Sequence, residues 1–301
     1  MSAPSQKPFR LRLPATSANL GPGFDTLGLA MDLYLTIDAT PAGGFRIDAT
    51  GRNADQCAPL EDNLILTTYM EILANAGVVA PYLYLQLHNE IPLGMGCGSS
   101  AAALLTGILL ANHFGNLNWT DQQILEEACR REGHPDNVAA CYLGGMTASC
   151  VTQDALVTAT FGHDLDWNLL LAIPTASLST KKARALLPAH YSREDAVTNI
   201  QSTALLVAAF AQGRSGLLRA AMRDRIHQPY RAKACPLLPL LLPLAEHPGV
   251  LGVALSGAGP SILLIAANPA PAPLDAAVRH AAKDPALEII HTTISKGTIL
   301  R

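Results

Sequence analysis

The sequence predicts an α+β protein of two domains, and three observations support this fold class. Its 301 residues are enough for one large domain or two ordinary ones. With 49% hydrophobic and 15% charged residues, the chain can form a sizeable apolar core. Predicted strands and helices follow one another without the regular alternation that indicates a parallel sheet. We place a boundary near 161–167, which divides the chain into domains 1–164 and 165–301.

The first part of the chain is rich in predicted strands. Runs of β-branched and alternating apolar residues predict these strands, and Gly43 with Gly44 marks a turn between two of them. The first helix is expected to end at Gly77, because glycine is favoured just beyond a helix C-terminus. The predicted strands are 9–15, 30–39, 45–50 and 82–88, and the predicted helix is 62–76.

Two further helices are expected after a glycine-rich turn. The segment 99–114 has helical composition and is followed by Gly115. The next helix has a clear start signal, because Thr120 can cap it and Gln123 at the third helical position completes a capping box. This helix is expected to end at Gly133. Its apolar stripe, which predicts the buried side, consists of Ile124, Leu125, Ala128 and Cys129.

The second half mixes predicted strands and helices. Ser192 and Gly213 are start and stop signals for a long helix over 192–212. The segment 235–248 is apolar enough for a packed helix, but Pro239 and Pro243 would break or kink it. The other predicted elements are strands 146–151, 156–161, 169–173, 250–255, 261–267 and 287–295, and helices 217–226 and 274–283.

Composition and charge exclude several classes of protein. A net charge of −3 without a basic patch argues against nucleic-acid binding. Residues 1–9 lack the apolar segment of a signal peptide, and apolar stretches such as 101–111 are too short to cross a bilayer. None of the six cysteines forms a C-x-x-C pair, and scattered thiols suit a reducing compartment. We therefore expect a cytoplasmic protein with neither nucleic-acid nor membrane partners.

The strongest local signal is the segment 91–103, IPLGMGCGSSAAA. Its glycines let the backbone approach a ligand, and the helix that follows presents free N–H groups and the positive end of its dipole. Ser99 and Ser100 add hydroxyls that can reach a phosphate or a magnesium ion. The segment is either a phosphate cradle or an ordinary strand-to-helix turn capped by serine. It matches neither a Walker A loop, nor a dinucleotide-binding fingerprint, nor a nucleophile elbow.

Two segments outside that turn carry candidate binding residues. In 14–25, Asn19 and Asp25 are expected in a loop tightened by Gly21, Pro22 and Gly23, where they could hold an ammonium or hydroxyl group. A simple Asx turn explains them as well.

The segment 132–137 (EGHPDN) follows the capped helix. Glu132 could hold magnesium, which prefers carboxylates together with phosphate oxygens. His134, a lone histidine in a turn, is expected to be structural. The last glycine-rich segment, 255–261, is either a hairpin turn or a second backbone cradle.

Taken in order, these motifs resemble those of the GHMP small-molecule kinases. The matching segments 14–25, 92–103 and 256–261 span essentially the whole chain. The resemblance implies an N-terminal ribosomal-protein-S5-domain-2-like domain that binds ATP, a C-terminal ferredoxin-like α/β sandwich, and an active site in the cleft between them. It also implies phosphoryl transfer from ATP to a small-molecule hydroxyl, with Mg²⁺ as cofactor.

Within the family, the chain is most similar to the branch that phosphorylates the side-chain hydroxyl of L-homoserine for threonine biosynthesis. The segments 16–25, 132–137, 178–184 and 228–231 carry this likeness, together with Gly144-Gly145. It implies that the amino and hydroxyl groups of homoserine bind to Asn19, Asp25 and Asp136. It implies that Arg184 and Arg231 bind the substrate carboxylate, a role that suits the planar guanidinium. The implied ATP phosphate loop is Pro92, Leu93, Gly94, Met95, Gly96, Cys97, Gly98, Ser99, Ser100, Ala101 and Ala102.

The same likeness implies a magnesium site and a mechanism. Ser100 and an upstream glutamate would bind the ion, with Glu132 as first choice and Glu126 as substitute. Some sister kinases use an aspartate base with a nearby lysine, but 14–25 contains no lysine. The likeness therefore implies no dedicated base, and Asp136 and Asn137 are expected to position the reacting groups.

Other functions stay open at this point. The chain could be another GHMP kinase with a carboxylate-bearing acceptor such as mevalonate, or a non-catalytic relative that senses its ligand. The paired arginines argue against a neutral sugar. A weaker alternative is a nucleotide-dependent oxidoreductase built on Gly257 and Gly259. The related enzymes are often dimers, and the apolar stretch 237–244 could supply either an interface or core.

Overall fold

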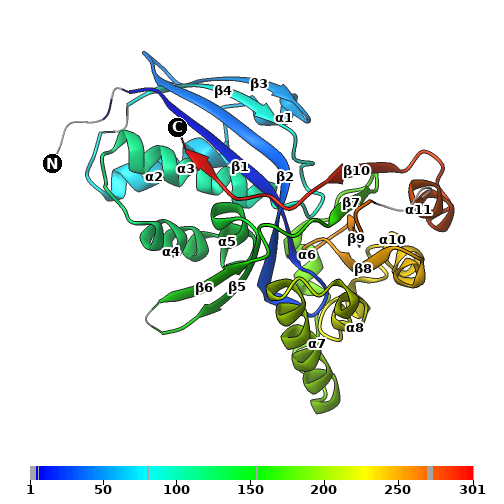
Figure 1. Ribbon diagram of the computed structural model, residues 1–301. Helices are drawn as coiled ribbons and strands as arrows, with labels where there is room; N and C mark the ends of the chain where they lie inside the picture. Colours follow the sequence, from blue (N-terminus) through cyan, green and yellow to red (C-terminus); the bar gives the residue numbers. More distant parts are fainter. Residues whose placement is uncertain (1–4, 6, 80, 154, 270–273, 301) are drawn as a thin grey trace.

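The computed structural model describes residues 5, 7–79, 81–153, 155–269 and 274–300, and they form two sheets with helices packed on them (Figure 1). The first sheet has seven strands. Its main path is β11-β1-β2-β4-β3, and β5 joins the other end of β2 and carries β6. The bounds are β1 (Phe9–Asn19), β2 (Gly23–Pro41), β3 (Arg46–Gly51), β4 (Leu83–Asn89), β5 (Met146–Val151), β6 (Leu156–Phe161) and β11 (Ile299–Leu300).

The long strand β2 shapes this first domain. It has 19 residues and pairs antiparallel with β1 along most of its length. Its later residues pair with β4 and its earlier ones with β5, so the sheet divides into two arms. Four helices supply the apolar side chains that cover it: α2 (Leu64–Asn75), α3 (Ser99–Phe114), α4 (Asp121–Glu132) and α5 (Asp136–Leu143).

The second sheet is antiparallel, with the order β10-β7-β9-β8. Helices follow its first strand and its third, which is the β-α-β-β-α-β arrangement of a ferredoxin-like domain. The fold expected from the motifs is therefore confirmed. The main elements are β7 (Asn168–Ile173), α7 (Arg193–Ala211), β8 (Val250–Leu255), β9 (Ile262–Ala266), α11 (Leu274–Ala282) and β10 (Glu288–Thr292).

Several shorter elements fill the connections. They are α1 (Ala54–Cys57), α6 (Thr180–Ala185), the 3-10 helix η1 (Ser215–Leu217), α8 (Leu218–Ala221), α9 (Gln228–Arg231), α10 (Leu237–Leu241) and the 3-10 helix η2 (Leu242–Glu246). In the stretch 237–244, Leu238 and Leu241 are buried in the second core, so part of this stretch is core.

The chain's last residues return to the first sheet. Ile294 bridges to Met31, and β11 pairs with β1 (Figure 1). One apolar core also spans both sheets, because Leu169 of β7 and Ile265 of β9 belong to the same buried cluster as Leu13 of β1. The division at 164/165 stays a prediction.

The capping signals read from the sequence are confirmed. Thr120 and Gln123 form the expected capping box, and the predicted apolar stripe of α4 is buried. The Ser192 hydroxyl accepts a hydrogen bond from the backbone N–H of Asp195 at the start of α7. No helix within the described ranges is both long and apolar enough to span a membrane.

Four local predictions are wrong. The helix predicted over 217–226 ends at Ala221, because the Asp224 carboxylate binds the backbone N–H groups that follow it and starts a new helix instead. The turn expected around His134 is followed at once by a helix that was not predicted, because Asp136 is the first residue of α5. The residues Asn19 and Asp25 lie in β1 and β2, with only 20–22 as the turn between them. The strand predicted over 287–295 is the shorter β10, Glu288–Thr292, and the short strand β11 follows it.

Candidate active site

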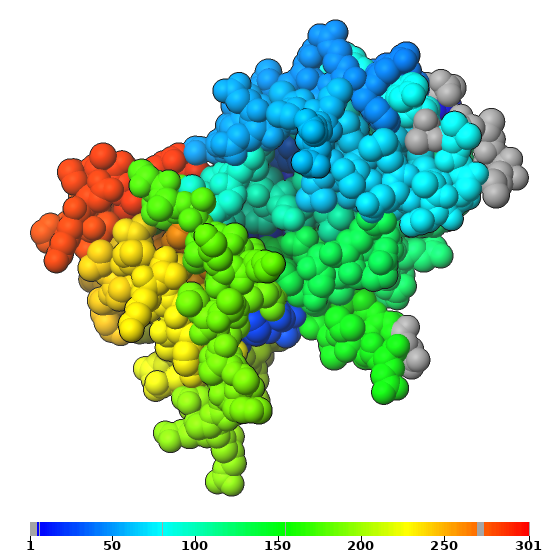
Figure 2. Space-filling model, turned by 180° about the vertical axis from the view of Figure 1, so that it is seen from behind, coloured from blue at the N-terminus to red at the C-terminus, as the bar shows by residue number. Residues whose placement is uncertain are grey.

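A cleft lies between the two domains, and the motif residues meet in it. In Figure 2, blue surface from the turn between β1 and β2 is visible between the green and yellow-green parts of the molecule. The fold brings these residues together from positions as far apart in the sequence as Asn19 and Gly259. The lining includes Asn19, Asp25, Gly94, Gly96, Cys97, Gly98, Ser99, Ser100, Glu132, His134, Asp136, Asn137, Arg184, Arg231, Gly257 and Gly259.

Every predicted substrate, catalytic and metal residue lies in this lining. Of the predicted phosphate loop, Gly94 and the residues 96–100 line the cleft as well. Ala101 and Ala102 are buried in the first turn of α3. Leu93 faces a neighbouring cavity instead. The remaining two, Pro92 and Met95, are not among the lining residues.

The glycine-rich loop has the conformation of a backbone cradle. Gly94, Gly96 and Gly98 have φ angles of 69°, 75° and 70°, which other residues rarely adopt. The N-cap of α3 is Gly98 rather than a serine, and no side chain caps the helix. The first N–H groups of α3 are therefore available to an anion, and the positive end of the helix dipole points the same way.

The loop is held by both other glycine-rich motifs. Ser256 donates a hydrogen bond from its hydroxyl to the carbonyl of Gly96 at 2.8 Å, and the backbone N–H of Thr16 donates to the carbonyl of Cys97 at 3.0 Å. A Cβ atom on Gly96 would lie 2.2 Å from the carbonyl oxygen of Ser256. The segment 255–261 is thus a turn that supports the phosphate loop.

Asn19 joins two sides of the cleft. Its side-chain amide donates to the carbonyl of Gly257 at 3.0 Å, and its Oδ1 accepts the backbone N–H of Asp25 at 3.0 Å. Both Asn19 and Asp25 have positive φ, so these two bonds stabilise a backbone conformation that side chains disfavour. Asn19 therefore orients Asp25 within the cleft.

Asp136 is buried at the start of α5, where the helix dipole favours a negative charge. Its Oδ1 accepts from the backbone N–H of Asn137 at 2.7 Å and lies 2.6 Å from His134 Nδ1. Burial alone would lower the pKa of His134, but the hydrogen bond and charge of Asp136 outweigh it and the pKa is raised. The interaction therefore favours the protonated imidazole of His134.

Asn137 connects this pair to β1. Its Oδ1 accepts a hydrogen bond from the Thr16 hydroxyl at 2.7 Å, and its amide nitrogen lies 3.2 Å from Asp136 Oδ1. Thr16 was missed as a site residue, although it belongs to the first motif. No local pattern pairs it with a side chain 121 positions away.

The two predicted arginines differ in their partners. Arg184 forms a two-pronged ion pair with Asp25, with N···O distances of 3.0 and 2.5 Å. Arg231 is 1% exposed and donates to the carbonyls of Ala183 and Gly257. Within the described ranges, no carboxylate lies within ion-pair distance of Arg231. Its burial and the neighbouring charge of Arg184 lower the pKa of Arg231, so an incoming anion would relieve an unfavourable arrangement.

Glu132 and Ser100 form a second polar pair at the mouth of the phosphate loop. The Ser100 hydroxyl lies 3.4 Å from Glu132 Oε2. Burial raises the pKa of Glu132, which a nearby cation would oppose. Glu126 is hydrogen-bonded to Gln122 and does not line the cleft. The geometry therefore favours Glu132 over Glu126 as a ligand.

A second group could in principle hold a cation. Ligand atoms of Asp25, His134 and Asp136 lie within 4.8 Å of one another. Asp25 is already paired with Arg184, whose positive charge disfavours a metal ion there. A hard cation is better served by Ser100 and Glu132, next to the loop that would hold phosphate oxygens.

A neighbouring cavity opens on the other side of the phosphate loop. It shares Ser99 and Ser100 with the cleft, and its remaining lining comes from β2, α1, α2, β4, α3 and the segments that connect them. Its apolar side chains and a few amide groups suit a flat heteroaromatic ring. The apolar lining residues are Leu35, Pro59, Leu64, Ile65, Leu87, Ile91, Leu93 and Ala103.

Comparisons with known proteins agree with this geometry. The models of the GHMP kinase N-terminal and C-terminal domains match 63–145 and 206–281. A homoserine kinase of Solibacter usitatus is 48% identical over 257 residues, covering 85% of this chain and 84% of that protein. One of Deinococcus radiodurans is 42% identical, with coverage of 87% and 85%. The crystal structure of homoserine kinase from Cytophaga hutchinsonii has a TM-score of 0.83 at 25% identity and is covered completely, as is this chain.

Proposed function

The chain belongs to the homoserine kinases of the GHMP kinase family, and on this basis we propose how its cleft transfers a phosphoryl group from ATP to the side-chain hydroxyl of L-homoserine. The product, O-phospho-L-homoserine, enters threonine biosynthesis. The observation that carries the placement of the substrate is Arg231, a buried guanidinium in the cleft with no carboxylate partner in the described ranges. A carboxylate-bearing substrate supplies that partner.

The charges of the cleft match a zwitterionic amino acid. The substrate carboxylate is placed at Arg231 and Arg184, and its ammonium group at Asp25 and Asp136. This arrangement alternates positive and negative charges, so each charge taken from water gains a partner of opposite sign. Asn19 acts by holding Asp25 in place. The homoserine side chain then extends toward the phosphate loop.

ATP is placed with its phosphates on the glycine-rich loop and the first turn of α3. Its adenosine lies in the neighbouring cavity, which meets the loop at Ser99 and Ser100. Ser100 and Glu132 would hold magnesium, as their chemistry suits a hard cation. When bound, magnesium neutralises part of the charge on the β- and γ-phosphates.

The residues of the chain act mainly by positioning. Asp136 Oδ1 accepts from His134 and Asn137, and the raised pKa of His134 disfavours a neutral imidazole that could take a proton. The hydroxyl of homoserine is held in line with the γ-phosphorus, where proximity and orientation can supply much of the rate enhancement. The proposal therefore includes no dedicated base.

Substrate choice tests this placement directly. We expect coupled ADP release with L-homoserine and little or none with L-serine, mevalonate or galactose. L-serine is one methylene shorter, so its hydroxyl cannot reach the γ-phosphate while its carboxylate is held. Galactose lacks a carboxylate, which leaves Arg231 unpaired. Equal turnover of mevalonate and homoserine would contradict the placement of the ammonium group at Asp25 and Asp136.

Removing the charge of Asp136 separates substrate binding from transfer. Asp136→Asn should raise KM for homoserine by roughly tenfold or more, because the ammonium loses a charged partner. Asn137→Ala should mainly lower kcat, since the Asn137 amide connects the Thr16 hydroxyl to the Asp136 carboxylate. Steady-state kinetics measure both values. Unchanged kinetics in both variants would remove these residues from the mechanism.

The magnesium site can be tested with a matched pair of glutamates on α4. Glu132→Gln should raise the magnesium concentration for half-maximal activity by roughly tenfold, because one charged ligand is lost. Glu126→Gln, on the same helix but outside the cleft, should leave that concentration unchanged. Magnesium titrations at fixed ATP and homoserine give both values. The assignment fails if the Glu126 variant shows the larger shift.

A further inference from the structure

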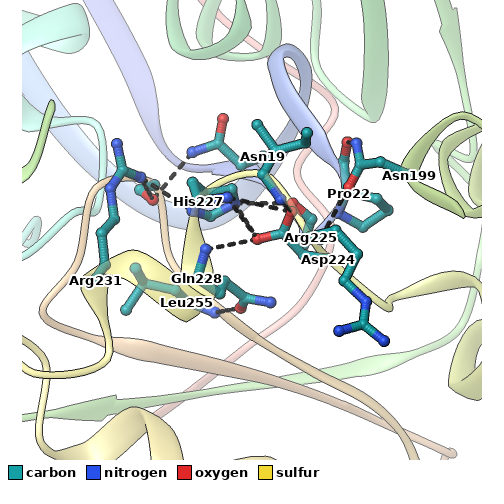
Figure 3. Close-up of polar contacts among 12 residues, drawn as sticks. Asn19, Pro22, Asn199, Asp224, Arg225, His227, Gln228, Arg231 and Leu255 are labelled. Carbon is teal, nitrogen blue, oxygen red and sulfur yellow. Dashed lines mark hydrogen bonds and ion pairs between the residues drawn. The ribbon is translucent and has the colours of Figure 1, made fainter. Parts of the chain in front are cut away.

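Arg231 contacts a buried polar cluster formed by Asp224 and His227 (Figure 3). These two residues have no part in the phosphoryl transfer proposed above. The side chains of Asp224 and His227 are both 0% exposed. The Asp224 carboxylate accepts hydrogen bonds from the backbone N–H groups of Ile226 at 2.7 Å, His227 at 3.1 Å and Gln228 at 2.6 Å. These bonds start α9, the four-residue helix that carries Arg231 at its end.

The partners of the His227 ring determine its protonation. Nε2 lies 2.8 Å from the carbonyl oxygen of Gly21, which can only accept, so Nε2 carries the hydrogen. Nδ1 lies 3.1 Å from a guanidinium nitrogen of Arg231, which can only donate, so Nδ1 accepts. Asp224 Oδ2, at 3.4 Å from Nε2, favours the hydrogen on the same side. Burial of the ring also lowers the pKa of His227, which agrees with a neutral imidazole.

Arg231 therefore has three acceptors on its protein side. Its Nε donates to the carbonyl of Ala183 at 3.3 Å, and Nη1 is shared between His227 Nδ1 at 3.1 Å and the carbonyl of Gly257 at 3.3 Å. The ring nitrogen is the shortest of these contacts. None of the three involves Nη2, so these contacts orient the guanidinium without using that nitrogen, and Arg231 lines the cleft.

We propose that His227 is a positioning residue for homoserine recognition. Its unprotonated Nδ1 holds the Arg231 guanidinium in the plane that meets the substrate carboxylate, and Asp224 supports both the tautomer and the start of α9. This inference rests on the proposed role of Arg231 in binding that carboxylate. It predicts that an acceptor at the Nδ1 position, rather than the imidazole itself, is what the site requires.

Two substitutions of His227 by residues with amide side chains test the roles of Nδ1 and Nε2 separately. The Oδ1 atom of asparagine can take the place of Nδ1 and still accept from Arg231, but asparagine is too short to reach Gly21. Glutamine places its amide near the Nε2 position, where it can donate to Gly21 and leaves Arg231 without this acceptor. Steady-state kinetics with homoserine and with ATP varied in turn, together with thermal denaturation, should be measured for His227→Asn and His227→Gln.

We expect the glutamine variant to raise KM for homoserine by roughly tenfold to a hundredfold, the range for losing a hydrogen bond to a charged group. The asparagine variant should stay within about threefold of the unmodified enzyme. KM for ATP should not change in either variant. Equal increases in both variants would overturn the proposal, because they would indicate that only the packing of the ring matters. No increase in the glutamine variant would overturn it as well.

A double substitution separates this inference from the proposed function itself. If His227 acts through Arg231, adding His227→Gln to Arg231→Met should not raise KM for homoserine further. A further increase would overturn the positioning role. If Arg231→Met alone leaves that KM unchanged, the proposed carboxylate site is wrong, and the role of His227 falls with it. His227→Leu replaces the glutamine variant if the latter does not fold, since leucine also lacks an acceptor.

Discussion

Arg231→Met should lower kcat/KM for homoserine by on the order of thirtyfold to several thousandfold. This factor corresponds to a loss of about 2–5 kcal/mol in transition-state binding, the range for removing one partner of a buried charge pair. KM for ATP should change much less, because Arg231 donates to Ala183, His227 and Gly257, and none of these belongs to the phosphate loop itself. The thermal stability of the enzyme without substrate should fall little or even rise. Methionine has a similar volume, and it removes a buried charge that has no carboxylate partner in the described ranges.

The matched control for this variant is Arg225→Ala. Arg225 lies six positions earlier, is exposed, and its side chain points away from the cluster in Figure 3. Its removal should leave KM for homoserine unchanged. Initial-rate kinetics and thermal denaturation of both variants provide the comparison. A large loss of stability with unchanged KM in Arg231→Met would mean that the guanidinium is structural, and the carboxylate would have to bind elsewhere.

Gly96→Ala should reduce kcat/KM for ATP by about a hundredfold or more, because an error of about 1 Å in positioning can cost that much. The new Cβ would lie 2.2 Å from the carbonyl oxygen of Ser256, so the phosphate loop or the 256–261 turn must move. Backbone atoms cannot give way as a flexible side chain can. The displaced loop would no longer present the first N–H groups of α3 to the phosphates.

Gly94→Ala isolates this steric effect. Gly94 has φ of 69° against 75° for Gly96, so both alanine variants carry a similar backbone cost of roughly 1–2 kcal/mol. A Cβ on Gly94, however, would meet only the Ser177 Cβ at 3.5 Å, an ordinary contact. The Gly94 variant should therefore lose much less activity with ATP than the Gly96 variant. Equal losses in the two variants would show that the positive φ, and not the contact with Ser256, determines the effect.

Much of the fold could be predicted because its signals are local. The capping box at Thr120, the N-cap at Ser192 and the bounds of α3 all depend on residues within one or two helical turns. Hydrophobic periodicity identifies the buried side of α4 for the same reason. The helix α5 was missed because its start, His-Pro-Asp-Asn, reads as a turn, and the burial that makes it helical comes from β1 and β2.

The candidate site was predicted as a set of residues, since each lies in a short motif whose order along the chain resembles a known family. Its charge arrangement depends on contacts that only the tertiary structure creates. Asp25 and Arg184 are 159 positions apart, and Asn19 meets Gly257 over 238 positions. Sequence alone therefore specified the glycine loop, the helix that follows it and the candidate arginines. Tertiary packing decided that Arg184 is paired with Asp25, whereas Arg231 has no carboxylate partner in the part of the chain that the structure describes. It also decided that His227 accepts a hydrogen bond from Arg231, because burial and partners depend on which distant segments meet.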